Sequence, residues 1–440
     1  MSCDQVWRVV SVKRSGMPGP WPWPVVGNAF SIIPHALHLS QFDFATRYGS
    51  VMCYWLGPEP WVLLSSVENI RVAFQDKFTA FDRESTITRL WHDIAGGLAL
   101  QPNGDGHKRS RDLVRPAFRA SNINNLIAHV VERARHLLDT LESHAKSGEP
   151  LDIQHEFQKL TFDIIGDLSM KFDFKTQTDE TSPYIHAFNY CMQHLIWRFI
   201  IPFPYWRFYK TNGVLEYEKH IDFLRSTIRG VIEKRRAQGV RDDDHDILAF
   251  MLRECGKEGK EWVDGHEIMM QTITFLLAAA QQRVRDEVDA VLGSETPTYH
   301  HLRALAHIDK AITETLRMRP ATPSLGREVT EDVTVDDGRG RQFTLAKGTK
   351  VGLSLYSAGM SPANGWSDPE VFDPERKEWT DGSKNAFFSF GLGPRACIGE
   401  DLARKEIKTV TSMILQKYEL RLATTLKARY GVQMTVHLRK

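Results

Sequence analysis

Residues 387–400 read F-F-S-F-G-L-G-P-R-A-C-I-G-E, which is the most specific pattern in the chain. It places one cysteine, Cys397, in a glycine-bracketed loop that directly precedes a run with helical spacing of apolar residues. We therefore expect Cys397 at or just before a helix N-terminus, where backbone N–H groups and the helix dipole favour a thiolate. Three glycines, Gly391, Gly393 and Gly399, let the backbone turn tightly and approach a flat ligand closely.

The chemistry of this loop favours iron in a porphyrin over zinc. A soft thiolate with no second cysteine and no nearby histidine suits the axial position of haem iron. Arg395, two residues before the cysteine, could pair with a carboxylate on such a ligand. A lone cysteine is ordinarily a small buried hydrophobe. That interpretation is kept for the remaining four, which are Cys3, Cys53, Cys191 and Cys255.

The composition of the chain excludes several classes of protein. The chain has 440 residues, 42% of them hydrophobic and 25% charged, with a net charge of +1, which excludes a disordered chain and gives no sign of a nucleic-acid partner. Five cysteines without a C-x-x-C pair predict a reducing compartment. No apolar run reaches about 18 residues and no signal-peptide core is present, so we expect neither export nor a transmembrane anchor.

The pattern of apolar residues predicts a mainly α fold with minor β sheets. Residues 51–64 read as a hairpin, and 333–353 return to strand character with a turn at Asp337-Gly338. Helical spacing runs from Ile123 to Leu141, and the stretch from Ile268 to Ala280 is apolar nearly all round, as in a buried helix. Strands and helices do not alternate regularly, which argues against a doubly wound nucleotide-binding fold.

The segment from Phe390 to Gly399 fills every fixed position of a known haem-loop signature, and the chain resembles the cytochrome P450 family over nearly its whole length. The resemblance implies that family's fold and haem b (iron protoporphyrin IX) as cofactor. It makes Cys397 the iron ligand and catalytic centre. It divides the chain into a proline-rich lead-in, residues 1–24, and a haem domain, residues 25–440. The cofactor loop would then include Phe390, Gly393, Arg395, Cys397 and Gly399.

Two further motifs carry the resemblance. Glu314 and Arg317 match the family's E-x-x-R, with positions i and i+3 on one helical face. Phe372-Asp373-Pro374-Glu375-Arg376 matches the later segment whose arginine joins that pair. Alone, E-x-x-R would be a solvated helix pair worth a few tenths of a kcal/mol. In this order ahead of the cysteine loop, the resemblance implies a buried ionic cluster.

Three more residues resemble partners of the haem propionates. The family usually has W-x-x-x-R, and here His107 stands in the tryptophan's place with Arg111 following. Arg327 lies where the family often has another propionate partner. The alternative for each is a surface cation, and for His107 and Arg327 the two interpretations weigh about equally.

The central helix departs from the family pattern. Thr274–Ala278 resembles the run that leads into the family's oxygen-activating motif, but residues 279–288 resemble a segment well downstream. Part of this helix is therefore predicted to be missing, and neither Thr272 nor Thr274 is assigned the proton-relay role. The gap is either an error of gene prediction or splicing, or a real and damaging loss.

The resemblance implies a haem-thiolate monooxygenase that inserts one oxygen atom from O2 into a lipophilic substrate, with a weak likeness to fatty-acid and alkane hydroxylases. Its electrons would come from NADPH through a separate reductase, because the chain has no flavin or nicotinamide fingerprint. Two alternatives stay open. The chain could bind haem without oxygen chemistry, or be a non-enzymatic remnant without haem.

The aromatic run from Leu195 to Trp206, followed by Arg207 and Lys210, suits a loop that dips into a membrane interface. A core helix that ends at Pro202 is an equally weighted alternative. By resemblance the location would be the endoplasmic reticulum membrane, with peripheral contact and no spanning anchor in this chain.

Overall fold

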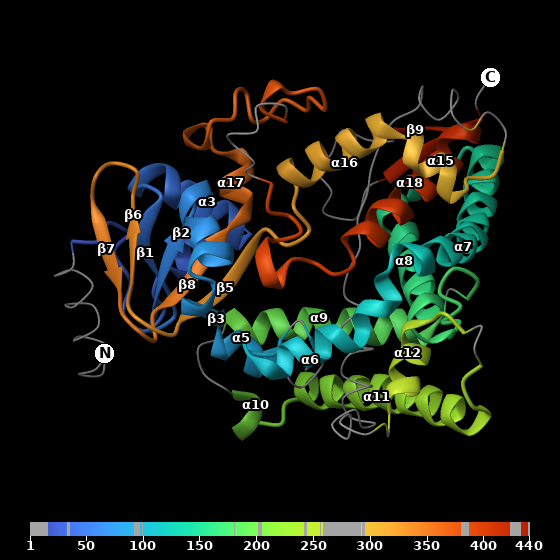
Figure 1. The fold of residues 1–440 in the computed structure, drawn as a ribbon, viewed down its shortest axis with the longest axis horizontal. Coiled ribbons are helices and arrows are strands. Elements are labelled where there is room, and N and C mark those ends of the chain that lie inside the picture. Colours follow the sequence, from blue (N-terminus) through green and yellow to red (C-terminus); the bar gives the residue numbers. More distant parts are fainter. Residues whose placement is uncertain are drawn as a thin grey trace.

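The computed structural model describes residues 16–440 except 33–35, 92–96, 99, 180, 201–204, 242–243, 256, 258–291, 293–294, 380–386, 423–432 and 439–440. Most of the described chain is helical, and a sheet-rich part lies at one end (Figure 1). The helices are α2 (Ala29–Ile32), α3 (Leu37–Tyr48), α4 (Val67–Arg71), α5 (Ser85–Trp91), α6 (Asp105–Val114), α7 (Ala120–Ser147), α8 (Ile153–Met170), α9 (Pro183–Ile200), α10 (Tyr205–Phe208), α11 (Asn212–Gln238), α12 (Ile247–Glu254), α15 (Tyr299–Ala304), α16 (Ala306–Met318), α17 (Leu355–Met360) and α18 (Glu400–Lys417).

The described strands form three sheets. The largest has the order β1-β2-β8-β5-β3, in which only the β2–β8 pair is parallel. A second has the order β4-β10-β9, and β6 pairs with β7 in a hairpin. The strands are β1 (Val51–Leu56), β2 (Glu59–Leu64), β3 (Phe81–Arg83), β4 (Leu151–Asp152), β5 (Ser324–Val329), β6 (Val333–Asp336), β7 (Gln342–Leu345), β8 (Lys350–Ser354), β9 (Tyr418–Leu422) and β10 (Gln433–Leu438).

The predicted hairpin at residues 51–64 is confirmed as β1 and β2. Its turn is short, because Glu59 and Pro60 already pair with Leu56 and Trp55 in the ladder. The predicted strand character of residues 333–353 is also confirmed, as β6, β7 and β8. The mainly α class with minor sheets is therefore correct.

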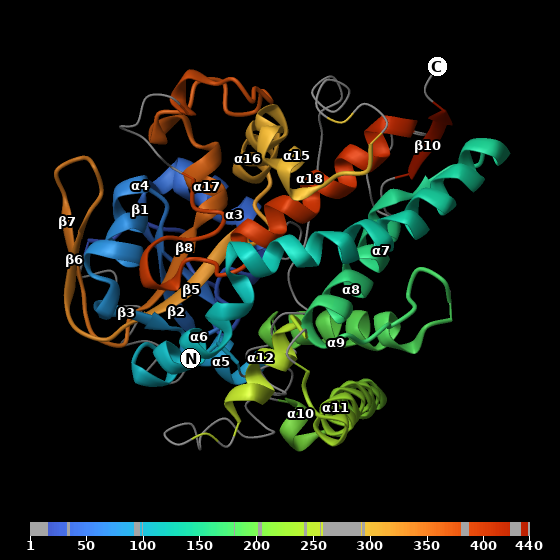
Figure 2. The same ribbon diagram turned by 45° about the vertical axis from the view of Figure 1, so that its right-hand side comes forward.

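Helix α7 is a long helix that contributes many residues to the main hydrophobic core. Its apolar residues follow the predicted three–four spacing, and Ile123, Val130 and Leu141 are completely buried. The helix ends at Gly148, whose φ of 73° gives the left-handed cap that a side chain would resist. Helix α18 runs alongside it (Figure 2), so that the helix after the cysteine loop is anchored in the main core.

The cysteine loop crosses the middle of the molecule, between the sheet at one end and α7 and α8 at the other (Figure 1). Helix α16 lies on one side of this crossing, and α6 lies on the other. Helix α9 is drawn level with α6 in that view, and α11, which packs against α9, lies below both. Two helices far apart in the sequence, α6 and α16, therefore lie on opposite sides of the loop.

The predictions on the central helix and on a transmembrane anchor can be compared only with the residues that the structure describes. The buried helix expected from Ile268 to Ala280 lies outside the described residues, as do Thr272, Thr274 and the break predicted after Ala278. None of the helices described is both long enough and apolar enough to cross a bilayer.

Candidate functional site

The cysteine loop is held by its own backbone. The N–H of Gly391 donates to the carbonyl of Phe388, and the N–H of Cys397 donates to the carbonyl of Phe390, both at 2.7 Å. A short 3₁₀ turn follows at Gly393–Arg395. Helix α18 begins at Glu400, so Cys397 lies just before a helix N-terminus, as the sequence predicts.

The three glycines of the loop have different roles. Gly391 and Gly393 have φ values of 70° and 67°, which confirms the predicted tight turning. A Cβ on Gly393 would lie 2.4 Å from the carbonyl oxygen of Phe74, so the close approach there is to protein. The expectation for Gly399 is wrong as regards turning, because its φ of −93° is open to any residue. A Cβ there would meet only the Phe118 ring at 3.6 Å and the Cys397 sulfur at 4.0 Å.

The expected thiolate at Cys397 needs a correction. Loss of water around the sulfur raises the pKa of the thiol above its ordinary value, although the residue as a whole is exposed. Hydrogen bonds from the N–H groups of Gly399 and Glu400, with the charge of Arg111, lower the pKa by less than burial raises it. The helix terminus therefore assists ionisation without achieving it, and a metal ion would have to displace the proton.

Two arginines join the loop to α6 and to the segment before it. Arg111 donates to the carbonyl of Ala396 at 2.9 Å. Arg395 donates to the carbonyl of Gln101 at 2.6 Å and to Oδ1 of Asn103 at 2.9 Å. These bonds bring the α6 arginine and the loop arginine to one place, as the resemblance implies.

Arg395 is part of a cluster of five basic side chains, which we call the cation cluster: Arg83, His107, Arg111, Arg327 and Arg395. Burial, followed by the charges of Arg395, Arg111 and Arg83, lowers the pKa of His107 to about 4. Burial and then Arg83 likewise lower the pKa of Arg395, to about 9.

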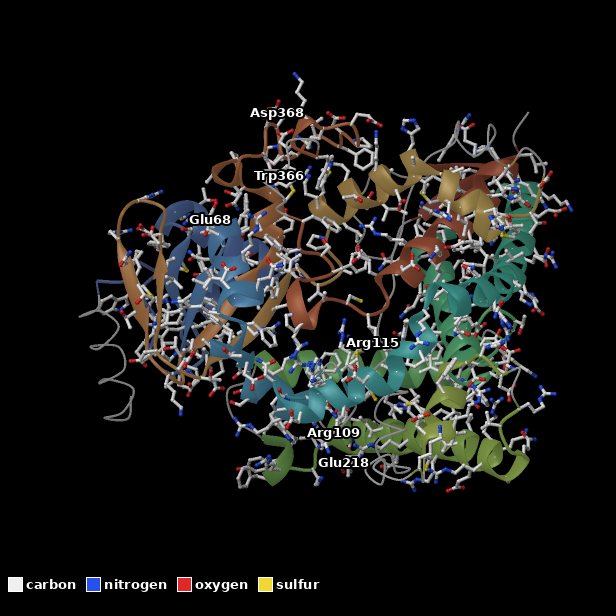
Figure 3. The ribbon with its side chains drawn as sticks, viewed as in Figure 1. Glu68, Arg109, Arg115, Glu218, Trp366 and Asp368 are labelled. Carbon is white, nitrogen blue, oxygen red and sulfur yellow. The ribbon has the colours of Figure 1, made fainter. Side chains whose placement is uncertain are left out.

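The pKa of Arg327 also falls well below its ordinary value, through burial and then the charges of Arg83 and Arg395. The strands explain this proximity, because Arg83 on β3 is paired with Arg327 on β5. Arg109 and Arg115 flank Arg111 along the chain (Figure 3), and both are exposed.

The cation cluster lacks matching negative charge. Within the described ranges, none of its four arginines forms an ion pair, and Nε of Arg83 is buried without a hydrogen-bond partner. Asp82 offsets some of the charge, yet its Oδ1 already accepts from the backbone N–H groups of Arg83 and Asn103. Buried cations without counter-charge are costly. The arrangement therefore fits a ligand that brings at least two carboxylates.

Sequence reasoning missed Arg83. It belongs to no motif, and only the β3–β5 pairing brings it beside Arg327, more than 240 residues later in the chain. The alternative that His107 and Arg327 are surface cations is wrong, since they are only 7% and 4% exposed.

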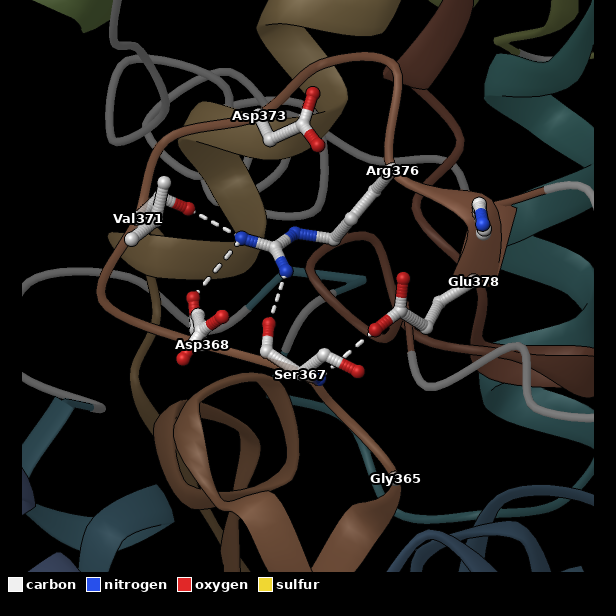
Figure 4. Close-up of a pocket in the computed structure, with 8 residues that line it drawn as sticks. Gly365, Ser367, Asp368, Val371, Asp373, Arg376 and Glu378 are labelled. Carbon is white, nitrogen blue, oxygen red and sulfur yellow. Dashed lines mark hydrogen bonds between the residues drawn. The ribbon is translucent and has the colours of Figure 1, made fainter.

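The predicted ionic cluster is confirmed. Glu314 accepts from Nε and Nη2 of Arg317 and from Nε of Arg376, each at 2.8 Å, and all three side chains are buried. Arg376 also donates to the carbonyls of Ser367, Asp368 and Val371 (Figure 4). Although burial alone would raise it, these arginines lower the pKa of Glu314.

Arg376 and its carbonyl partners line a polar pocket of about 520 Å³. Because all three guanidinium nitrogens of Arg376 donate hydrogen bonds, the cluster fixes the chain segment that precedes the cysteine loop. The pocket therefore belongs to this structural device.

The aromatic segment is only partly described. Leu195 and Arg198 are buried in α9, which ends at Ile200, as the core-helix interpretation requires. Beyond the undescribed residues 201–204, Phe208 and Tyr209 are 66% and 63% exposed. Within the predicted run, Leu195 and Arg198 are thus buried and Tyr205 and Trp206 are half-buried, whereas the exposed rings follow the run.

Comparison with known proteins supports the family resemblance that the sequence motifs indicate. The profile of the family described as Cytochrome P450 matches residues 17–280 and 279–430. Cytochrome P450 4d1 of Drosophila melanogaster is 27% identical over 459 residues, covering 92% of this chain and 88% of the relative. Cytochrome P450 4V2 of Pongo abelii is 27% identical, with coverage of 90% and 84%, and Cytochrome P450 3A6 of Oryctolagus cuniculus is 22% identical, with coverage of 93% and 87%.

The profile match spans most of the chain, and it includes the cysteine loop, the cation cluster and the buried ionic cluster. The chain therefore belongs to the cytochrome P450 family, whose members are haem-thiolate monooxygenases that use haem b and receive electrons from NADPH through a reductase.

Proposed function

We propose that residues 25–440 form one haem domain in which Cys397 ligates the iron, and that it inserts one oxygen atom from O2 into a lipophilic substrate. The observation that carries this proposal is the cation cluster beside the cysteine loop. Its four arginines and one histidine lack matching counter-charge among the described residues, and two of them, His107 and Arg327, are buried. Haem b has two propionates, which are the charge that this cluster requires.

The donor set fits the cofactor. The cation cluster would hold the propionates, and Phe390, Gly393 and Gly399 would frame the iron-side loop. Gly399 carries no side chain beside the Cys397 sulfur, where a Cβ would lie 4.0 Å from that atom. When bound, haem supplies the chemistry that activates dioxygen.

The protein's own part is to hold the sulfur and to balance its charge. The N–H groups of Gly399 and Glu400 donate to the sulfur and reduce its electron density, and Arg111 adds positive charge nearby. Because Arg111 also binds the Ala396 carbonyl, it would couple the propionate side of the site to the sulfur loop.

The substrate class follows from resemblance, and fatty acids or alkanes are our specific proposal. We further propose a separate NADPH-dependent reductase as redox partner. For location we propose peripheral contact with the endoplasmic reticulum membrane. Exposed Phe208 and Tyr209 beside exposed Arg207 and Lys210 support such contact, since aromatic rings with flanking cations suit a bilayer interface.

A vesicle-flotation experiment tests the membrane contact. We expect the chain to float with anionic phospholipid vesicles and the double variant Phe208→Ser/Tyr209→Ser to float less. Equal flotation of both, or none of either, contradicts this part of the proposal.

A second candidate function is haem binding without oxygen chemistry, and a particular observation favours it. The two family matches meet at residues 279–280, which is where we propose that part of the central helix is missing. The alignment with Cytochrome P450 4d1 is also longer than the whole 440-residue chain, so that relative carries residues that have no counterpart here.

The first experiment is the absorption spectrum of the reduced, carbon-monoxide-bound protein, with Cys397→Ala as control. We expect a strongly red-shifted Soret band that the control loses. Absence of the band in soluble protein supplied with haem contradicts thiolate ligation. NADPH-dependent product formation with added reductase then separates the monooxygenase from the oxygen-inactive alternative.

Haem content of two neighbouring variants tests the propionate assignment. Arg111→Ala should bind less haem, because it removes a half-buried cation of the cluster. Arg109→Ala, exposed on the same helix, should bind normally. Full haem content in Arg111→Ala would contradict the role of this arginine.

A further inference from the structure

Two histidines face each other across the seam between α9 and α11. The ring centroids of His186 and His220 are 5.3 Å apart, and their planes meet at 65°. Two imidazoles that share one tetrahedral zinc ion at Zn–N distances of about 2.0 Å have centroids about 5 Å apart. The observed spacing therefore matches that of a shared metal ion.

The surroundings hold this pair in position. The Tyr190 ring lies 4.8 Å from the His220 ring, and its hydroxyl donates to the carbonyl of Gly213 at 3.3 Å. Tyr190 thus joins α9 to the start of α11 and supports the imidazole of His220 from the side. A ligand pair that is fixed before the ion arrives loses less conformational freedom on binding.

Both imidazoles are available to a ligand. Across the part of the chain that the structure describes, neither ring takes part in a hydrogen bond or an ion pair. Glu216, one turn before His220, pairs instead with Lys219 at 2.6 Å. Glu218 (Figure 3), which lies between Glu216 and His220 along α11, pairs with Lys210. Because His186 is exposed, an ion can reach the seam from solvent.

We propose that His186 and His220 bind one divalent transition-metal ion, such as Zn²⁺ or Cu²⁺, and so connect α9 to α11. Imidazole nitrogen suits these ions, and Cu²⁺ should bind more tightly than Zn²⁺. The described residues contain no group of three metal-binding side chains, so water completes the coordination. The site is independent of the haem site and of its loading.

Competition with a chromophoric chelator measures the affinity of the haem-loaded full chain for Zn²⁺. We expect one ion with a dissociation constant in the micromolar range. His186→Gln and His220→Gln should each weaken binding at least tenfold, and the double variant should bind no more weakly than either single one. His155→Gln, exposed on α8, is the matched control and should bind as the wild type does.

Two further readouts separate ligation from a general structural effect. Zn²⁺ should raise the unfolding temperature of the wild type and the control but not of the variants, whereas Mg²⁺ should raise none of them. Electron paramagnetic resonance of bound Cu²⁺ should report two coordinating nitrogens in the wild type. Unchanged Zn²⁺ affinity in either single variant, or no binding by the wild type at millimolar Zn²⁺, overturns the proposal.

Discussion

Arg83 on β3 and Arg327 on β5 are directly opposite each other in an antiparallel strand pair, and the charge of Arg83 lowers the pKa of Arg327. Like charges in opposite positions destabilise a sheet, because their side chains share one face. The pair is therefore unfavourable until an anion lies between the two side chains. This gives the haem-free and haem-bound proteins opposite responses to the same substitution.

Arg83→Gln should weaken haem binding while leaving the haem-free chain as stable as the wild type or more stable, by roughly 0.2–1 kcal/mol. The first effect follows from the loss of a propionate partner and the second from relief of repulsion. Haem titration and urea unfolding of the haem-free protein measure them. Arg89→Gln, an exposed arginine on α5, should change neither quantity. Loss of stability in haem-free Arg83→Gln would show that this arginine is instead structural.

Glu314→Gln should lower the free energy of unfolding by about 3–5 kcal/mol, because it leaves Arg317 and Arg376 buried without their shared carboxylate. Urea unfolding measures the change. Glu375→Gln removes a carboxylate that pairs at the surface with His307 and Lys310, and it should cost less than about 0.5 kcal/mol. Similar losses in both variants would contradict the special role of the buried cluster.

Gly393→Ala should disrupt the cysteine loop more than Gly391→Ala. Both glycines have left-handed φ values, so each substitution costs about 1–2 kcal/mol of backbone strain. Only at Gly393 would the new Cβ also lie 2.4 Å from the Phe74 carbonyl, whereas at Gly391 the nearest atom is 3.8 Å away. Thermal unfolding and haem content should therefore fall further for Gly393→Ala, and equal losses would rule out the steric argument.

The haem-free protein should lose stability between pH 6.5 and pH 4 partly through His107. The pKa of this buried group is about 4 in the folded chain and near 6.5 when unfolded, so the unfolded state takes up the proton first as the pH falls. Above pH 6.5 the imidazole is neutral in both states and contributes no pH dependence. His107→Gln should flatten this slope in urea unfolding at a series of pH values. An unchanged slope would contradict the depressed pKa.

The sequence predicted the local features because neighbouring residues determine them. The cysteine loop before α18, the hairpin of β1 and β2, the stripe of α7 and the Glu314–Arg317 pair all depend on spacing within one element or turn. Backbone geometry and helical periodicity act over a few residues, so their signals are visible in the chain itself.

The tertiary structure alone decided which charges meet and how much water surrounds them. Arg83 joins the cation cluster only through strand pairing with a segment more than 240 residues away. The pKa of Cys397 is raised because the folded chain removes water from its sulfur. This effect is larger than the lowering of the pKa by the N–H groups at the helix N-terminus, which the sequence predicts. Desolvation and long-range pairing depend on the packing of distant segments, and no local pattern of residues encodes them.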